Sequence, residues 1–315
     1  MVHEATDFPQ GGVSDRPKSS LPWQSRILLL AAIWGSSFVL IKFGDQSFAP
    51  LQIALGRLAF GTAILLVIVA IRREALPRGV VLWFQLAVAA LVSNALPFTL
   101  FAYGETRTTS ILAGIANATT PLFTLLVAMA VLADERPDRA RVAGLVLGFL
   151  GVLVVFGIWS GLGGNELIGN LACLGAAVSY GFSFPFMRRY LARRPESAIS
   201  LVTGQLICGT IEIAIITPFF TSMPASISIK SWVSVIILGA LGTGIAFVLN
   251  YGLIRDIGAT MASIVTYIVP LFATVEGALV LGERITWNEP VGALIVILGV
   301  AITQGRVTPA RWRHA

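Results

Sequence analysis

Charged residues are scarce in this sequence. Only 12% of its 315 residues are Asp, Glu, Lys or Arg, about half the share found in an ordinary soluble domain. Hydrophobic residues reach 56%, and the mean hydropathy is +0.84. A soluble fold has no place for so much apolar surface, because positions that face water must be mostly polar. The scarcity of charge therefore argues against a soluble domain and indicates a polytopic membrane protein.

Histidine and cysteine are rarer still. Both histidines, His3 and His314, lie near the ends of the chain, and Cys173 and Cys208 fall inside apolar segments without CxxC spacing. No Ser-His-Asp or histidine-metal arrangement can form within the bundle, and metal and redox roles are disfavoured. A Gly-x-x-x-x-Gly-Lys-[Ser/Thr] frame is also missing, which excludes nucleotide hydrolysis by that route. We therefore expect no cofactor and no metal, and an integral-membrane enzyme is the disfavoured alternative class.

Long apolar runs are what the sequence has in abundance. A spanning helix needs about 20 mostly apolar residues, and charge clusters, Pro/Gly pairs and polar turns separate ten such runs. Barrel strands would instead alternate apolar and polar residues over short stretches. The predicted spans are residues 27–43, 50–71, 80–102, 108–132, 139–158, 167–188, 197–220, 231–253, 258–281 and 288–305. Residues 1–26, polar and without an apolar core before Leu28, are expected to form a disordered cytoplasmic tail, and residues 306–315 a second one.

The basic residues predict how these spans are oriented. If the N-terminus is cytoplasmic, 17 of the 22 Lys and Arg residues fall on the cytoplasmic side, four on the other side, and Arg57 inside a span. Lys and Arg remain on the cytoplasmic side of membrane proteins. The sequence therefore predicts a multi-pass protein of the cytoplasmic (inner) membrane with both termini cytoplasmic. The net charge of +6 then follows from topology and does not indicate nucleic-acid binding.

A five-residue frame, Tyr-Gly-x-x-Arg, occurs at residues 103–107 and again 148 positions later at 251–255. The same offset aligns further glycines, a threonine and a Glu-Arg pair, and a Pro-Leu-Phe triplet recurs with one extra residue. The aligned pairs are Gly56/Gly204, Gly61/Gly209, Thr62/Thr210, Glu135-Arg136/Glu283-Arg284, Gly144/Gly292 and Gly151/Gly299. Matches at one offset indicate an internal duplication.

The duplication divides the chain into two halves of five helices, residues 27–158 and 167–305. Because five is odd, the second half enters from the opposite side of the membrane. The sequence thus predicts an all-α polytopic membrane protein whose ten transmembrane helices form two inverted five-helix repeats. The two Tyr-Gly-x-x-Arg frames would mark equivalent helix ends, where the Gly ends the helix and the Arg lies at the interface. Inverted repeats favour alternating access around a midplane site over a receptor or a fixed pore.

Three segments carry a likeness to a known family: "AAIWGSSFVLIKFG", "TPLFTLLVAMAVLADER" and "VPLFATVEGALVLGER". Over about residues 27–305 the sequence resembles the EamA family of the drug/metabolite transporter superfamily, and within it YddG-like exporters of aromatic amino acids. The resemblance implies a secondary transporter that exports amino acids, aromatic ones among them, or related small metabolites. Small multidrug members of the superfamily carry an embedded Glu in their first helix. Here that helix has Trp34 and no acid, which disfavours proton antiport by that scheme.

Polar and aromatic side chains at mid-depth are the candidates for a solute site, because polar groups in lipid are costly unless they face the bundle interior. Several of them precede a proline, which frees a backbone carbonyl one turn back. The candidates are Trp34, Asn94, Asn117, Thr120, Tyr180, Asn250 and Tyr267. This chemistry suits a zwitterionic or amphipathic solute, whereas a polyphosphate would need several interior cations. The alternative is that these groups only bind neighbouring helices.

Arg57 is a charge inside a predicted span. It lies seven residues into the second span, about 10 Å below the outer end and so in the outer third. An unpaired Arg there is costly, so we predict an ion pair with Glu276, or with Glu212 as the second candidate. The other half has Gln205 at the equivalent position, so the pair would exist on one side only. This asymmetry leads to the hypothesis of an outer gate, with a static structural bridge as the alternative.

Two further questions remain open at this level. A multidrug or nucleotide-sugar-like transporter of the same fold is the alternative to an amino-acid exporter, and the partners we expect are a small-molecule substrate and the lipid bilayer. The spacing of Gly144, Gly148 and Gly151, with Gly292 and Gly299 in the other half, predicts close helix packing. That contact is equally compatible with packing inside one molecule and across a dimer, so the oligomeric state stays open.

Overall fold

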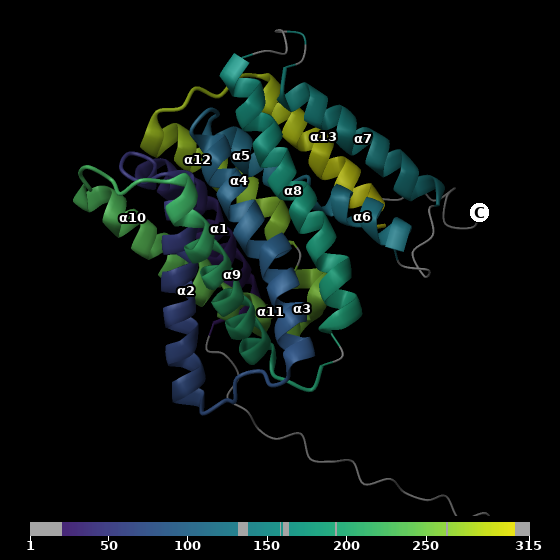
Figure 1. Ribbon diagram of the computed structural model, residues 1–315. Coiled ribbons are helices and arrows are strands. Elements are labelled where there is room, and N and C mark those ends of the chain that lie inside the picture. The colour runs from purple at the N-terminus through teal and green to yellow at the C-terminus, as the bar shows by residue number, and fades with distance from the viewer. Residues whose placement is uncertain are drawn as a thin grey trace, which may run out of the picture.

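The computed structural model describes residues 21–131, 138–157, 159, 164–192, 194–262 and 264–305. The regular elements of these residues are all helices, packed side by side into one bundle (Figure 1). The helices of the first half are α1 (Trp23–Gly44), α2 (Pro50–Arg72), α3 (Val80–Ala90), η1 (Leu91–Ala95), α4 (Leu96–Glu105), α5 (Ser110–Asn117), α6 (Thr120–Val131) and α7 (Arg139–Val155).

The second half repeats this order. Its helices are α8 (Gly164–Tyr190), α9 (Ala198–Phe220), α10 (Ile229–Gly239), η3 (Ala240–Ile245), α11 (Ala246–Ala262), α12 (Val265–Leu281) and α13 (Asn288–Thr303). In both halves the third span is one helix with a π-helical segment, η1 or η3, in its interior. The fourth span of the first half is broken between α5 and α6, whereas α12 is continuous.

Length and hydropathy identify seven of these helices as able to cross a membrane, with the joined segments counted as one. Two further apolar helices, Val265–Leu281 and Asn288–Thr303, are shorter. Large apolar side chains are exposed along the outside of the bundle, as lipid-facing surfaces require; examples are Val80, Phe84 and Phe219. The fold is therefore that of an all-α polytopic membrane protein, as the sequence predicts.

Equivalent helices of the two halves pack against each other in antiparallel pairs. Between α2 and α9, the hydroxyl oxygens of Thr62 and Thr210 lie 2.9 Å apart. These two residues are 148 positions apart, so each contacts its own counterpart in the repeat. A residue can touch its own equivalent only where the pseudo-twofold axis passes between them. The axis therefore crosses the α2–α9 contact. Gln52 in the first turn of α2 bonds to Ser222 just past the end of α9, and Ser200 in the first turn of α9 bonds to Ala75 just past the end of α2, so the two helices run antiparallel and the halves are inverted.

The second antiparallel pair, α7 and α13, lies at one side of the bundle (Figure 1). A Cβ atom added at Gly299 would come within 2.5 Å of the backbone nitrogen of Gly148, and one at Gly151 within 2.7 Å of that of Val296. Side chains at these positions would hold the backbones apart. The prediction of close packing at these glycines is confirmed, and the contact lies inside one molecule.

The two Tyr-Gly-x-x-Arg frames do not both end a helix, so this prediction is wrong. The first frame lies at the end of α4, but α11 continues past the second frame to Ala262. Gly104 and Gly252 have no left-handed backbone. A Cβ at Gly104 would lie 2.5 Å from the sulfur of Cys173, and one at Gly252 would lie 3.5 Å from Arg26. Gly104 therefore serves close packing, whereas a Cβ at Gly252 would make only an ordinary contact. Because α11 continues to Ala262, the predicted boundary at residues 253–258 is wrong too. Glu135 and Arg136 of the other repeated pair lie outside the described residues.

Candidate functional site

The two π-helical segments lie at equivalent places near the middle of the bundle. Pro97 follows η1, lacks an N–H and would crowd the carbonyl four residues earlier in a regular helix, and the wider π-helical turn accommodates it. η3 contains glycines and no proline. A Cβ at Gly244 would lie 2.8 Å from the Cβ of Ile64 on α2. Glycine there allows η3 to approach α2 closely. π-Helical segments often occur at functional sites.

Arg57 extends from α2 of the first half to η3 of the second. Its Nε donates to Thr243 Oγ1 at 3.0 Å, and its guanidinium carbon lies 3.8 Å from the ring centroid of Phe98 on α4. The residue is 8% exposed. An Arg at the centre of a span costs about 2.5–3.5 kcal/mol on insertion scales, which a desolvated cation–π contact of about 2 kcal/mol partly offsets. Thr243 lies near the middle of its helix, so the charge reaches deeper than the predicted outer third.

Gln205 of α9 is the counterpart of Arg57 and makes the equivalent contact, to the π-helical segment of the first half. Its Nε2 donates to Oδ1 of Asn94 in η1 and to Ser93 Oγ at 2.8 Å. Asn94 is fully buried, and its Nδ2 has no hydrogen-bond partner among the described residues. Each half thus sends one polar side chain into the π-helical segment of the other half. One of these side chains is charged and the other is neutral.

The predicted ion pair of Arg57 is not formed in this structure. Glu276 Oε1 accepts a hydrogen bond from Ser36 Oγ at 2.8 Å, and Glu212 Oε2 is buried without a partner among the described residues. Arg57 contacts Thr243 because η3 brings this hydroxyl close to α2. Helix depth alone, on which the prediction rested, does not contain that information. A gate built from this ion pair has no support in the arrangement described here.

Two aromatic candidates border the same centre. Tyr180 of α8 packs against both large apolar clusters of the bundle, its ring lies 6.2 Å from that of Phe101, and it is within electrostatic reach of Arg57. The neighbouring Ser179 donates to the carbonyl of Val92 in η1 at 2.7 Å, which fixes α8 to this segment. Trp34 of α1 is half-buried and packs against the first cluster.

The remaining candidates lie elsewhere in the bundle. Asn117 and Thr120 border the break between α5 and α6, where Thr120 Oγ1 is buried and without a partner in the described part of the chain. Tyr267 donates from its hydroxyl to Gln304 Oε1 at 2.6 Å and packs near α7 and α13. Asn250 is half-buried on α11. The seven candidates therefore do not form one site. Tyr180 packs against the cluster that contains Phe98, the ring in contact with Arg57, and Asn94 lies in η1, where it accepts a hydrogen bond from Gln205.

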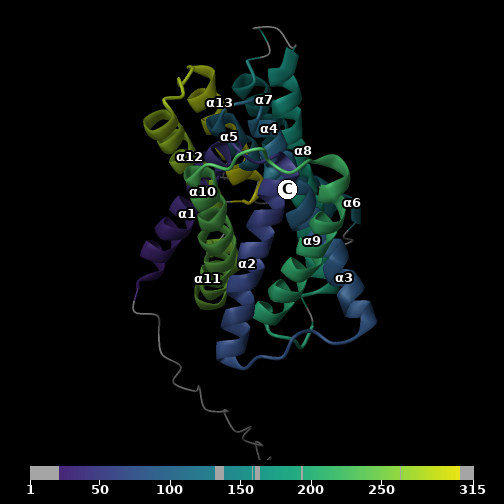
Figure 2. The ribbon, with the colours of Figure 1, turned by 60° about the vertical axis from the view of Figure 1, so that its left-hand side comes forward.

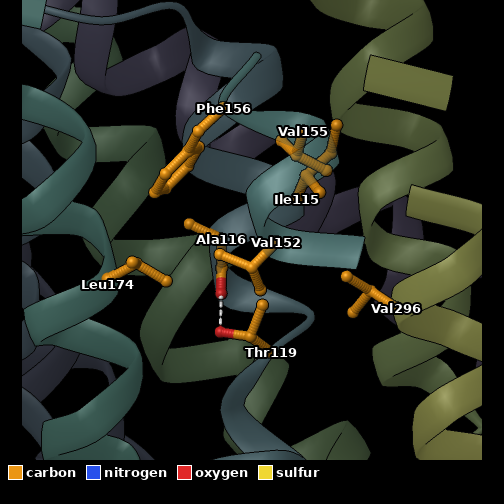
Figure 3. Close-up of a pocket in the computed structure, with 8 residues that line it drawn as sticks. All are labelled: Ile115, Ala116, Thr119, Val152, Val155, Phe156, Leu174 and Val296. Carbon is orange, nitrogen blue, oxygen red and sulfur yellow. Dashed lines mark hydrogen bonds between the residues drawn. The ribbon is translucent and has the colours of Figure 1, made fainter. Parts of the chain in front are cut away.

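A narrow crevice, too small to hold a water molecule, lies where α5 ends (Figure 3). Its walls are mostly aliphatic side chains of α5, α7, α8 and α13, such as Ile115, Val152 and Leu174. Its one hydroxyl, on Thr119, donates to the carbonyl of Ala116 at 2.6 Å. With that hydroxyl already bonded and no room for a water molecule, the crevice is not a solute site in this structure.

A polar layer that the sequence reasoning missed lies where α1 and α4 end. Lys42 Nζ donates to the backbone carbonyls of Glu105 and Thr108, the latter at 2.6 Å. Thr108 Oγ1 also donates to Asn170 Oδ1. Burial raises the pKa of Asp45, which follows α1, while the nearby cations Lys42 and Arg107 act in the opposite direction. The signal in the sequence was Lys42 near the end of an apolar run, one of the four basic residues predicted on the non-cytoplasmic side.

Glu283 closes the same end from the second half. Its carboxylate accepts hydrogen bonds from the backbone N–H of Ser110 at 2.8 Å, from the Ser110 hydroxyl at 2.8 Å and from the N–H of Ile111 at 3.2 Å. An anion at a helix N-terminus is favourable, because those N–H groups have no partner within the helix. The repeated Glu-Arg pair therefore has a structural role in its second copy, where it ties the α12–α13 connection to α5.

The EamA-like transporter family matches the chain twice, over residues 21–157 and 167–304, which correspond to the two inverted halves. This chain belongs to the EamA-like transporter family. It is a membrane transporter, and the sequence resemblance is confirmed at this level.

Relatives of this EamA-like transporter match most of its length. The chain is 27% identical over 276 residues to "Uncharacterized transporter YoaV" of Bacillus subtilis (strain 168), which covers 87% of this chain and 94% of the relative. It is 26% identical over 301 residues to "Probable amino-acid metabolite efflux pump" of Escherichia coli (strain K12), with 91% and 95% covered. A solved crystal structure covers 90% of this chain and 99% of its own, with a TM-score of 0.64 at 20% identity, which shows the shared fold.

Proposed function

We propose that this transporter exports amino acids or related small metabolites across the cytoplasmic membrane by alternating access, with both termini cytoplasmic. The observation that carries the proposal is the pseudo-twofold axis between Thr62 and Thr210. Two inverted halves with equivalent contacts can exchange conformations, and the exchange exposes a central site first to one side of the membrane and then to the other.

The direction and the substrate class are supported by relatives and by chemistry. A relative that matches over 91% of this chain carries the name of an amino-acid metabolite efflux pump. The centre of the bundle presents Arg57, the amides of Asn94 and Gln205, and the aromatic rings of Phe98 and Tyr180. These groups suit a small solute that carries charge as well as apolar surface.

Transport by the purified full-length chain in liposomes tests the function. A panel of radiolabelled amino acids is loaded inside, and efflux is followed with and without a pH gradient. We expect saturable efflux of at least one amino acid above that of empty liposomes, and a change with the gradient would identify proton coupling. Efflux equal to that of empty liposomes for every panel member would overturn amino-acid export.

Labelling of single cysteines tests the orientation. We expect Ser14→Cys to react from the cytoplasmic side and Asn165→Cys from the opposite side in intact cells and inverted vesicles, in a background lacking Cys173 and Cys208. Reaction of both positions from the same side would contradict the inverted topology.

A further inference from the structure

We propose that the guanidinium of Arg57 is the binding site for the carboxylate of the transported solute. The inference rests on the proposed function and narrows it to solutes that carry a carboxylate. Its starting point is a group whose bonding is incomplete: Arg has five N–H donors, and in the described structure a hydrogen bond from Nε to Thr243 uses one of them.

Arg57 makes no salt bridge among the described residues. Its hydrogen-bond partner is a hydroxyl and its other close contact is the ring of Phe98, so neither neutralises the charge. Of the two predicted partners, Glu276 is bonded to Ser36, and Glu212 Oε2 is buried without a partner among the described residues. The fully buried carboxyl of Glu105, at the end of α4 beside Lys42, also makes no ion pair with Arg57. A buried cation with free donors favours an anion, and a carboxylate fits the two-pronged face of a guanidinium.

The repeat separates the structural from the functional role of this side chain. At the equivalent position Gln205 also reaches the π-helical segment of the opposite half and donates to Asn94. A neutral amide is thus sufficient for the contact between halves. The positive charge of Arg57 is not required for that contact, and ligand binding gives it a role.

The surroundings also favour an organic carboxylate over inorganic phosphate. The guanidinium lies against Phe98, and Tyr180 nearby packs on Phe101. Arg57 is the one interior cation of this centre among the described residues, whereas a phosphate ester with two charges usually meets several. A single cation beside aromatic rings suits a monocarboxylate with an apolar or aromatic body.

The test compares matched solutes and matched variants in the full-length protein in liposomes. The solutes are the panel amino acids, L-phenylalanine among them, each with its amide, which lacks the carboxylate charge. The variants are Arg57→Gln, Arg57→Lys and the control Arg107→Gln. Arg107 also stacks on an aromatic ring, that of Tyr103 at 4.0 Å, but lies beyond the end of α4. Melting temperatures in detergent check the folding of every variant.

We expect the wild type to export the amino acid and not the amide. Arg57→Gln should raise the KM for the amino acid about 10- to 100-fold, the loss expected for hydrogen bonds to a charged group, and should reduce the discrimination against the amide. The KM of Arg57→Lys should lie between those of the wild type and Arg57→Gln, because an ammonium keeps the charge but cannot bind a carboxylate through two parallel hydrogen bonds. This variant tests the inference if Arg57→Gln does not fold. Arg107→Gln should match the wild type.

Three results would overturn the inference, and they differ in what they leave intact. If Arg57→Gln folds and keeps the wild-type KM and selectivity, the carboxylate site is wrong and amino-acid export stands. If the wild type exports amides or amines but no carboxylates, the site is wrong and export of small metabolites stands. If the wild type exports no member of the panel, amino-acid export and the carboxylate site are both overturned.

Discussion

Positions 57 and 205 occupy equivalent places on antiparallel helices, and each reaches a π-helical segment of the opposite half. The backbone arrangement around them is nearly the same: α2 and α9 lie side by side (Figure 2), and η1 and η3 occupy equivalent positions in the third span of each half. The chemistry differs. Arg57 contacts a hydroxyl and a ring, while Gln205 contacts the amide of Asn94 and the hydroxyl of Ser93.

The comparison shows which features the duplication keeps and which it lets diverge. Packing positions such as Gly151 and Gly299 must stay small in both halves, because the backbones meet there in both. At positions 57 and 205 the side chain only needs to reach the π-helical segment of the opposite half and donate a hydrogen bond. The fold is consequently symmetric in its backbone, while the charge is concentrated on one side of the axis.

The largest expected effect tests the symmetry of the backbone. Gly151→Ala and Gly299→Ala each place a Cβ within 2.7 Å of backbone atoms, so each should lose about 3 kcal/mol or more of stability through overpacking. The two losses should be alike, since the sites are equivalent. Melting temperature and monodispersity in detergent measure them.

The matched control for these glycines is Gly175→Ala. Its Cβ would meet Leu100 at 3.5 Å, an ordinary contact, so the melting temperature should change little. A large loss at Gly299 with none at Gly151 would show that the two halves do not depend equally on this contact.

The next effect tests the asymmetry of charge. Gln205→Arg would place a second cation beside Asn94, at a position that is 3% exposed, and should destabilise the protein by about 2–3 kcal/mol. Adding Asn94→Asp supplies a counter-ion and should recover most of the loss. The double-mutant cycle in detergent is the measurement. Purely additive losses would mean that these two side chains do not contact each other.

A smaller effect is expected at the end of the bundle closed by Glu283. Glu283→Gln keeps one acceptor oxygen and removes the charge from the N-terminus of α5, so we expect a loss of about 1–2 kcal/mol in thermal stability. The control Glu166→Gln changes an exposed acid in the first turn of α8 and should be neutral. Equal melting temperatures for wild type and Glu283→Gln would remove the structural role of this carboxylate.

The smallest effect is expected at Tyr267, which has no hydroxyl-bearing aromatic counterpart in the first half. Tyr267→Phe removes the hydrogen bond to Gln304, a pair that is largely exposed, and should cost about 0.5 kcal/mol. Export should remain close to the wild-type rate, because the hydroxyl bonds to α13 rather than to the centre around Arg57. A loss of export at unchanged stability would contradict this prediction and indicate that Tyr267 contacts the solute.

The helices and the repeat could be predicted because they depend on local features: apolar runs, charge bias and a constant offset. The end of α11 could not, because Asp256 continues that helix while bonded to Arg26 at 2.8 Å, a contact between distant segments. The same limit applies to Arg57. Its depth follows from its place in α2, but its partner depends on η3, whose wider turn changes which side chain faces α2.

The hydroxyl pair of Thr62 and Thr210 has a consequence for the motion itself. If the halves exchange their shapes, each contact away from the axis is replaced by its counterpart in the other half. A contact between a residue and its own counterpart is carried into itself and is the same before and after. This pair can therefore act as a fulcrum, and a disulfide formed in Thr62→Cys with Thr210→Cys should leave the cycle running, whereas a tether at either end of the bundle should stop it.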